Sequence, residues 1–167
     1  MNLEELARDQ LARGGDRWRD ARRAFRDGRW PDTVRFSQEA VELALKGLLR
    51  ALAVEVPKRH DVGPVLEQMR EELPNDLRDE LPEIVRLSAA LADRRALAMY
   101  GEEATGRPAR QLFADRQEAK GFLEGAGRVV RRVGEAFRAA DAERSRSAPL
   151  PRGGPRRPRR GKRRSAP

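Results

Sequence analysis

The residues of this chain that are best suited to chemistry are cations gathered at its C-terminal end. From Arg144 to Pro167 there are ten Lys or Arg residues and no acidic residue. Seven of these cations fall within nine consecutive positions, namely Arg156, Arg157, Arg159, Arg160, Lys162, Arg163 and Arg164. Cations at this density attract phosphate backbones by releasing condensed counterions, without reading base sequence. We therefore expect this segment to bind RNA or another polyanion, although a composition-biased extension without a role is an open alternative.

A second candidate site lies at the end of a helix that we predict over residues 77–100. Arg95 and Tyr100 stand five residues apart there. An arginine can hold an RNA phosphate, and a tyrosine ring can stack on a base. The same two residues also fit an ordinary helix end, where a cation stabilises the negative end of the helix dipole. The sequence leaves both interpretations open.

The single His and the absence of Cys limit the catalytic chemistry of the chain. Without Cys there are no disulfides, thiolate nucleophiles or zinc–thiolate sites. One His cannot form a histidine metal site unless a dimer supplies a second, so we expect no metal and no cofactor. We interpret His60 as a turn or helix-start residue, because a lone imidazole seldom acts without partners. Glu42 and Lys46, at i,i+4 spacing, are interpreted as an ordinary surface ion pair.

The net positive charge belongs to the C-terminal segment and not to the body of the chain. The sequence of 167 residues has a formal net charge of +9, with 36 basic and 27 acidic residues. Ten of the basic residues lie in the last 24 positions, so the preceding 143 residues have a balance of −1. The last segment is rich in Pro, Gly, Arg and Ser and has too little apolar surface to offset its ordering entropy. We expect one folded domain over residues 1–142 and a disordered basic tail over residues 143–167.

Apolar residues recur at intervals of three and four through the body, a pattern typical of amphipathic helices. The clearest helix is predicted from about residue 32 to residue 54, at the centre of a bundle. Beside its apolar stripe runs a stripe of small residues where another helix could approach closely: Ala40, Ala44, Gly47 and Ala51. A helix over residues 3–25 precedes it and is weakened in the middle by Gly14 and Gly15.

The rest of the body is predicted to be helical as well. A short helix is followed by a long one over residues 77–100, with Pro82 as a break or restart near its beginning. A loop over residues 101–113 leads to a final helix, in which Asp115 is the N-cap and Glu118 its capping-box partner. No period-two runs or β-branched clusters suggest a strand. We predict an all-α, up-and-down bundle of four long helices plus one short helix, followed by the disordered tail.

The segment from Phe36 to Leu49, FSQEAVELALKGLL, resembles the signature helix of the HEPN family (higher eukaryotes and prokaryotes nucleotide-binding). The residues from Trp18 to Trp30 are similar to the family's first helix and turn, and His60-Asp61-Val62 resembles the start of its third helix. The residues from Arg95 to Glu103 and the Ala-rich last helix resemble the archaeal and bacterial branch. The resemblance covers roughly residues 10–140 and excludes the tail.

The resemblance implies a helical bundle that forms a homodimer through a two-fold interface. It also implies frequent partnership with small nucleotidyltransferases in toxin–antitoxin pairs. Many members are metal-independent ribonucleases that use an Arg followed four to six residues later by a His. In this chain Arg94 and Arg95 are followed by Met99 and Tyr100 where that His is expected. Without an imidazole, no nearby group titrates close to neutrality to share in proton transfer.

From these observations we expect a non-catalytic or weakly active HEPN-like dimer that binds RNA, with the tail supplying general affinity. One alternative is a divergent ribonuclease that uses Arg95 with Tyr100. Another is a partner subunit of a small nucleotidyltransferase, with the small-residue stripe and the loop over residues 101–113 as contact surfaces. The N-terminus has no secretory hydrophobic run, and no apolar stretch approaches the roughly 20 residues of a membrane span. We expect a cytoplasmic protein without membrane contact.

Overall fold

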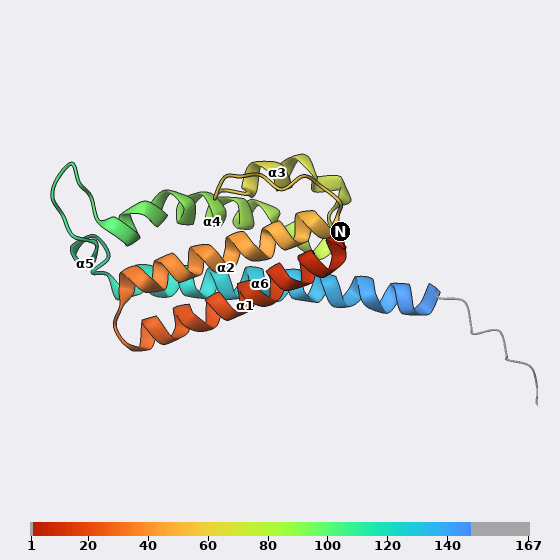
Figure 1. Cartoon of the computed structure of the whole chain (residues 1–167), viewed down its shortest axis with the longest axis horizontal. Coiled ribbons are helices and arrows are strands. Elements are labelled where there is room, and N and C mark those ends of the chain that lie inside the picture. Colours follow the sequence, from red (N-terminus) through yellow and green to blue (C-terminus); the bar gives the residue numbers. More distant parts are fainter. Residues whose placement is uncertain (1, 148–167) are drawn as a thin grey trace, which may run out of the picture.

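The computed structural model describes residues 2–147 of the chain, and the segment 148–167 lies outside the described part. The elements are α1 (Leu3–Arg26), α2 (Trp30–Ala51), α3 (Gly63–Gln68), the 3-10 helix η1 (Arg70–Glu72), α4 (Asn75–Tyr100), α5 (Ala109–Leu112) and α6 (Arg116–Ser147). The four long helices α1, α2, α4 and α6 run alternately in opposite directions in one bundle (Figure 1). Over residues 2–147 there is no β-strand, and the prediction of an all-α, up-and-down bundle with four long helices is confirmed.

Helices α1 and α2 pack together along the predicted small-residue stripe. A methyl group built on Gly14 would lie 3.1 Å from the carbonyl oxygen of Ala40 and 3.2 Å from the backbone nitrogen of Ala44. One built on Gly47 would lie 2.9 Å from the carbonyl oxygen of Ala7. The two backbones therefore approach so closely that a side chain would force them apart. Gly14 was expected to weaken the first helix. Instead, its lack of a side chain allows α2 to pack closely, and α1 continues through this position without interruption.

The hydrophobic core lies between α2, α4 and α6, with α2 in the predicted central position. Its fully buried side chains come from all three helices and include Val34, Leu45, Leu49, Leu91, Ala126 and Val133. Helix α2 contributes the most of them, because it is buried on one side by α1 and on the other by α4 and α6. None of the helices in residues 2–147 combines the length and the apolar character needed to cross a membrane.

Helix α2 ends three residues earlier than the periodicity predicts, because the chain turns at Ala53. The φ angle of Ala53 is +56°. Its backbone N–H donates to the carbonyl of Arg50 (3.0 Å), and the N–H of Val54 donates to that of Leu49 (2.9 Å). This pair of hydrogen bonds is a Schellman motif, which usually places glycine at the left-handed position. An alanine there hides the helix end from a sequence-based prediction.

Two predicted features of α4 and the following loop are wrong. Helix α4 continues through Pro82 instead of breaking there. Pro82 is exposed, so the carbonyl group that loses its helical donor can be hydrated. The segment predicted as a loop over residues 101–113 contains the short helix α5.

The start of α6 is also different from the prediction, and its end lies further along the chain. Asp115 accepts a hydrogen bond from the N–H of Gln117 (2.7 Å), as a cap should. Glu118 does not complete a capping box, because its carboxylate pairs with Arg94 on α4 (3.0 Å). Helix α6 continues to Ser147, past the domain boundary expected at residue 142.

Candidate functional site

Arg95 lies on the side of α4 that faces the bundle, in the same row as Ser88 and Leu91. Those two residues are 3% and 0% exposed, and Arg95 follows them by seven and four residues, spacings that place it in line with them. Arg95 itself is half-buried. Its neighbour Arg94 is bound by Glu118, whereas no acidic side chain in residues 2–147 forms an ion pair with Arg95. The Arg95 charge is therefore available to a partner.

The structure does not bring Arg95 and Tyr100 together within one chain. Five residues along a helix correspond to about 140° around its axis. Tyr100 is accordingly 73% exposed, and Met99 beside it is 37% exposed. The helix ends there because Gly101 has a φ angle of +77°. A site that uses both Arg95 and Tyr100 needs a ligand or a second molecule that reaches around the end of α4.

A polar cluster centred on Glu42 was not predicted. One carboxylate oxygen of Glu42 lies 2.7 Å from Nζ of Lys46, and the other accepts from Nε2 of Gln38 (2.7 Å) and contacts Nδ1 of His60 (2.9 Å). The side chains of Glu42 and Lys46 are only 16% and 13% exposed. The interpretation of this pair as an ordinary surface contact is therefore wrong, because the pair is largely buried and His60 also contacts Glu42. No sequence signal links His60 to a residue 18 positions earlier.

The Glu42 carboxylate is stabilised in its charged form. Burial raises its pKa, but hydrogen bonds from Lys46, Gln38 and His60 outweigh that effect and leave the pKa below its usual value. An ionised Glu42 holds the imidazole of His60 by Nδ1. The only His of the chain is thus engaged on α2.

The loop that carries His60 is fixed to the middle of α4, away from Arg95. Ser88 Oγ donates to Asp61 (2.7 Å) and accepts from the N–H of Val62 (3.1 Å). Ser88 precedes Arg95 by seven residues, or about 10 Å along the helix. A general base must lie within hydrogen-bond reach of the proton it removes. His60 therefore does not supply the imidazole that is missing beside Arg95 in the same chain.

The seven cations predicted to bind nucleic acid, Arg156 to Arg164, lie outside the described residues. The structure does decide from which end of the bundle that segment departs. The Arg94–Glu118 ion pair joins the last turns of α4 to the first turn of α6. From Glu118, α6 runs on to Ser147, a distance of about 43 Å for a helix of this length. The segment after Ser147 therefore begins at the opposite end of the bundle from Arg95 (Figure 1).

The described part of the chain has no set of side chains arranged to bind a metal ion. In residues 2–147, no group of three or more His, Asp or Glu side chains is arranged to hold a metal ion. The two tryptophans pack within the bundle. Trp18 donates from Nε1 to the carbonyl of Leu123 (3.2 Å), and Trp30 contacts the ring of Phe25.

Comparison with known proteins gives one match. A family model described as "HEPN domain" matches residues 7–136. The matched range begins in α1 and ends in α6, so it includes Arg95, the Glu42 cluster and all four long helices. No curated protein and no solved structure matches the sequence.

Proposed function

Because the chain belongs to the HEPN family, we propose that it is a two-fold homodimer that binds RNA in the cytoplasm and has little or no nuclease activity. The observation that carries this proposal is the state of Arg95. Arg94 and Arg95 stand where the resemblance expects the catalytic arginine; Glu118 pairs with Arg94, and no acidic residue in the described chain neutralises Arg95. A half-buried guanidinium without an acidic partner can hold a phosphate through two parallel hydrogen bonds.

The absence of a base beside Arg95 supports binding without efficient cleavage. Residues four to six positions after Arg95 are Met99, Tyr100 and Gly101, and none of them is an imidazole. His60 is held by Glu42 elsewhere. Cleavage of RNA at neutral pH needs a group that accepts and returns a proton, and general acid–base catalysis typically contributes 10²–10⁴-fold. Without it, phosphate binding by Arg95 remains and rapid turnover does not.

The C-terminal cations would add a second, sequence-independent contact. Residues 148–167 carry eight Lys or Arg residues and no acid. The last described residue before this segment, Ser147, lies about 43 Å along α6 from its first turn, so an RNA that contacts both Arg95 and the region of Ser147 must extend along the bundle. We therefore expect the tail to strengthen the binding of long RNA more than that of short RNA.

The test is a binding titration with single-stranded RNA at several salt concentrations. Four proteins are compared: the full chain, a variant truncated after Ser147 so that α6 stays intact, Arg95→Ala, and Arg86→Ala as a control from the exposed side of α4. Each lost phosphate contact should lower the slope of log affinity against log salt by about 0.7. Arg95→Ala should lower the slope by about one contact and truncation by several, while Arg86→Ala changes neither slope nor affinity.

Two outcomes would contradict the proposal. If the truncated protein binds RNA with unchanged affinity and salt slope, the tail has no role in RNA binding. RNA cleavage without added metal that disappears in Arg95→Ala identifies a divergent ribonuclease, the alternative function. Cleavage that survives Arg95→Ala points to another site or to a contaminant. The dimer is checked separately by sedimentation equilibrium on the full chain.

Partnership with a small nucleotidyltransferase is a second candidate function. The observation that favours it is the surface at the end of α4, where exposed Tyr100 adjoins a turn closed by hydrogen bonds between Glu102 and Arg107 (2.9 and 3.2 Å). The small-residue stripe is less suitable than the sequence suggested, because α1 covers Ala40 and Ala44 completely. Co-purification with a nucleotidyltransferase encoded beside the gene supports this function, and loss of the complex on deleting the 102–107 turn would locate the contact.

A further inference from the structure

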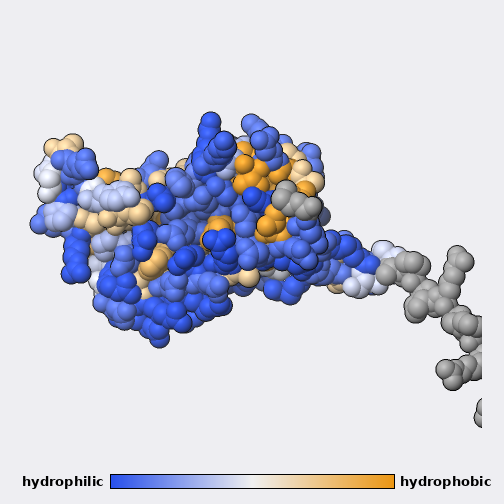
Figure 2. All heavy atoms as spheres, viewed as in Figure 1, coloured by the Kyte–Doolittle hydropathy of each residue, from blue (hydrophilic) through white to orange (hydrophobic). Residues whose placement is uncertain are grey.

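An apolar cavity opens at the end of the bundle that lies opposite Arg95. Its volume is about 310 Å³, and its lining includes Leu3 from α1, Leu48 and Leu52 from the end of α2, and Phe137 and Ala140 from α6. It forms because α2 stops at Ala51 while α6 continues to Ser147, so this stretch of α6 lacks a complete set of helix neighbours. Figure 2 shows hydrophobic surface near the start of α1, on a face that is otherwise mostly hydrophilic.

The cavity is large enough for the body of a small ligand. A dry apolar cavity of about 150 Å³ in a protein core accommodates benzene, and this cavity has about twice that volume. Leu48 on its floor is 4% exposed, whereas Leu3 at its edge is 44% exposed. Water makes few favourable interactions with an apolar surface, and a hydrocarbon chain of matching size would displace water from the cavity. The walls therefore select an apolar ligand body.

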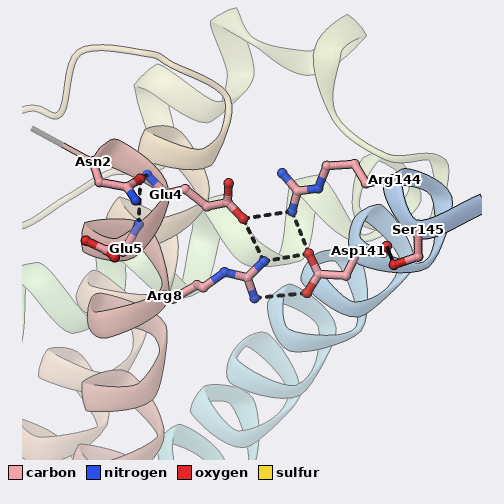
Figure 3. A network of polar contacts seen from close by, with 7 residues as sticks. All are labelled: Asn2, Glu4, Glu5, Arg8, Asp141, Arg144 and Ser145. Carbon is pink, nitrogen blue, oxygen red and sulfur yellow. Dashed lines mark hydrogen bonds and ion pairs between the residues drawn. The ribbon is translucent and has the colours of Figure 1, made fainter. Parts of the chain in front are cut away.

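Two of the three arginines that line the cavity are already neutralised. Figure 3 shows Arg8 and Arg144 bound to Glu4 and Asp141. The guanidinium of Arg8 reaches Asp141 with two hydrogen bonds (2.5 and 2.9 Å) and Glu4 with one (2.8 Å). These contacts lower the pKa of Asp141 to about 2, so the carboxylate stays ionised and keeps both arginines. Neither arginine is free for a ligand.

Arg50 is the cavity arginine without a carboxylate partner in the described chain. It lies in the last turn of α2, and its Nη1 donates only to the neutral side-chain oxygen of Gln10 (3.2 Å). A positive charge thus remains uncompensated beside an apolar cavity. A ligand with a hydrocarbon body and one anionic group complements both properties.

We propose that this cavity binds a medium-chain alkyl carboxylate, with the chain against Leu48 and Phe137 and the carboxylate on Arg50. A carboxylate can form two parallel hydrogen bonds with a guanidinium. The site is separate from Arg95, and it lies at the end of the bundle where α6 ends at Ser147.

The experiment is calorimetric titration of the full chain with hexanoate, octanoate and decanoate below their micelle concentrations, and with 1-octanol. Each added methylene should tighten binding about fourfold, the ratio expected for burial of one CH₂. Octanoate should bind more tightly than 1-octanol. Arg50→Gln should reduce octanoate to the affinity of 1-octanol and leave the effect of chain length unchanged.

Two further variants distinguish the cavity from general attraction to a basic protein. Arg138 is an exposed residue of α6 that does not line the cavity. The Arg138→Gln variant should therefore retain full binding. Ala140→Phe fills the cavity from an exposed position and should abolish binding of both the acid and the alcohol. Backbone amide shifts in ¹⁵N spectra should appear at Ala53 and Ala140.

Three results would overturn the proposal. The first is no binding of decanoate by folded full-length protein. The second is an affinity independent of chain length, which would indicate charge attraction alone. The third is equal loss of octanoate binding in Arg50→Gln and Arg138→Gln, or amide shifts confined to the C-terminal segment.

Discussion

Replacing Gly47 by Ala should destabilise the protein, although the same change normally stabilises a helix. In a helix interior, Gly→Ala favours folding by about 1 kcal/mol. At Gly47, however, the new methyl group would lie 2.9 Å from the carbonyl oxygen of Ala7 and 3.4 Å from the backbone nitrogen of Leu11. These atoms belong to a helix backbone, so no rotamer change relieves the contact. Overpacking of this kind costs about 1–3 kcal/mol, which leaves a net loss of about 1 kcal/mol.

Gly15 is the matched control. It also lies inside a helix, but nothing lies within 4 Å of a methyl group built on it. Gly15→Ala should therefore gain the full propensity term of about 1 kcal/mol. The two variants should differ by about 2 kcal/mol in the free energy of unfolding, or about 4–8 °C in Tm for a chain of this size.

Urea unfolding followed by far-ultraviolet circular dichroism measures this difference. All proteins are compared at one concentration, because the proposed dimer would unfold in a concentration-dependent way. If Gly47→Ala is as stable as Gly15→Ala with the same m value, the backbones of α1 and α2 do not approach closely. The small-residue stripe would then be open to a partner, and our reason for preferring the end of α4 as a docking surface would be lost.

Three other predictions concern single residues. Ala53→Gly should stabilise the protein by about 0.5–1 kcal/mol, measured as a rise in Tm. The left-handed φ of +56° costs a residue with a Cβ atom about 1–2 kcal/mol. Glycine's extra unfolded-state entropy offsets only part of this cost. Asp141 has a folded pKa of about 2 against its ordinary 3.8, so its contacts stabilise the protein above about pH 4 and are lost as the pH falls toward 2. Asp141→Asn should therefore show a shallower loss of urea midpoint over that range, and an unchanged acid profile would contradict this. Glu42→Ala should cost about 1–3 kcal/mol, since it leaves the covered Lys46 without its acceptor, whereas the more exposed Glu39→Ala should cost well under that amount in the same urea assay.

Whether the two candidate RNA contacts contribute independently to the free energy of RNA binding can be measured. Arg95 and Ser147, the last described residue before the tail, lie at opposite ends of the bundle. Changes at sites more than about 10 Å apart with no shared partner usually add. The losses of RNA affinity on Arg95→Ala and on truncation should therefore sum in the double variant. Strong coupling between them would mean that the tail reaches Arg95, on the same chain or on the second protomer.

The sequence alone determined the four long helices and the central position of α2. Apolar intervals of three and four residues are local properties, and they identified all four long helices and the central position of α2. The stripe with Gly47 predicted a close helix neighbour, because only small residues permit such an approach. The HEPN resemblance was likewise carried by local segments in the right order, and the family match confirms it. The charge imbalance of the C-terminal segment needs no structure to be recognised.

Only the tertiary structure decided which polar groups meet. Glu118 fits a capping box by sequence, but the packing of α4 against α6 gives it Arg94 as a partner. His60 reaches Glu42 because Ser88 fixes its loop to α4, and the cavity beside Arg50 exists because two helices end at different heights. These contacts join residues far apart in the chain, and no periodicity encodes them. Local patterns specify elements, whereas the pairing of charges follows from how those elements pack.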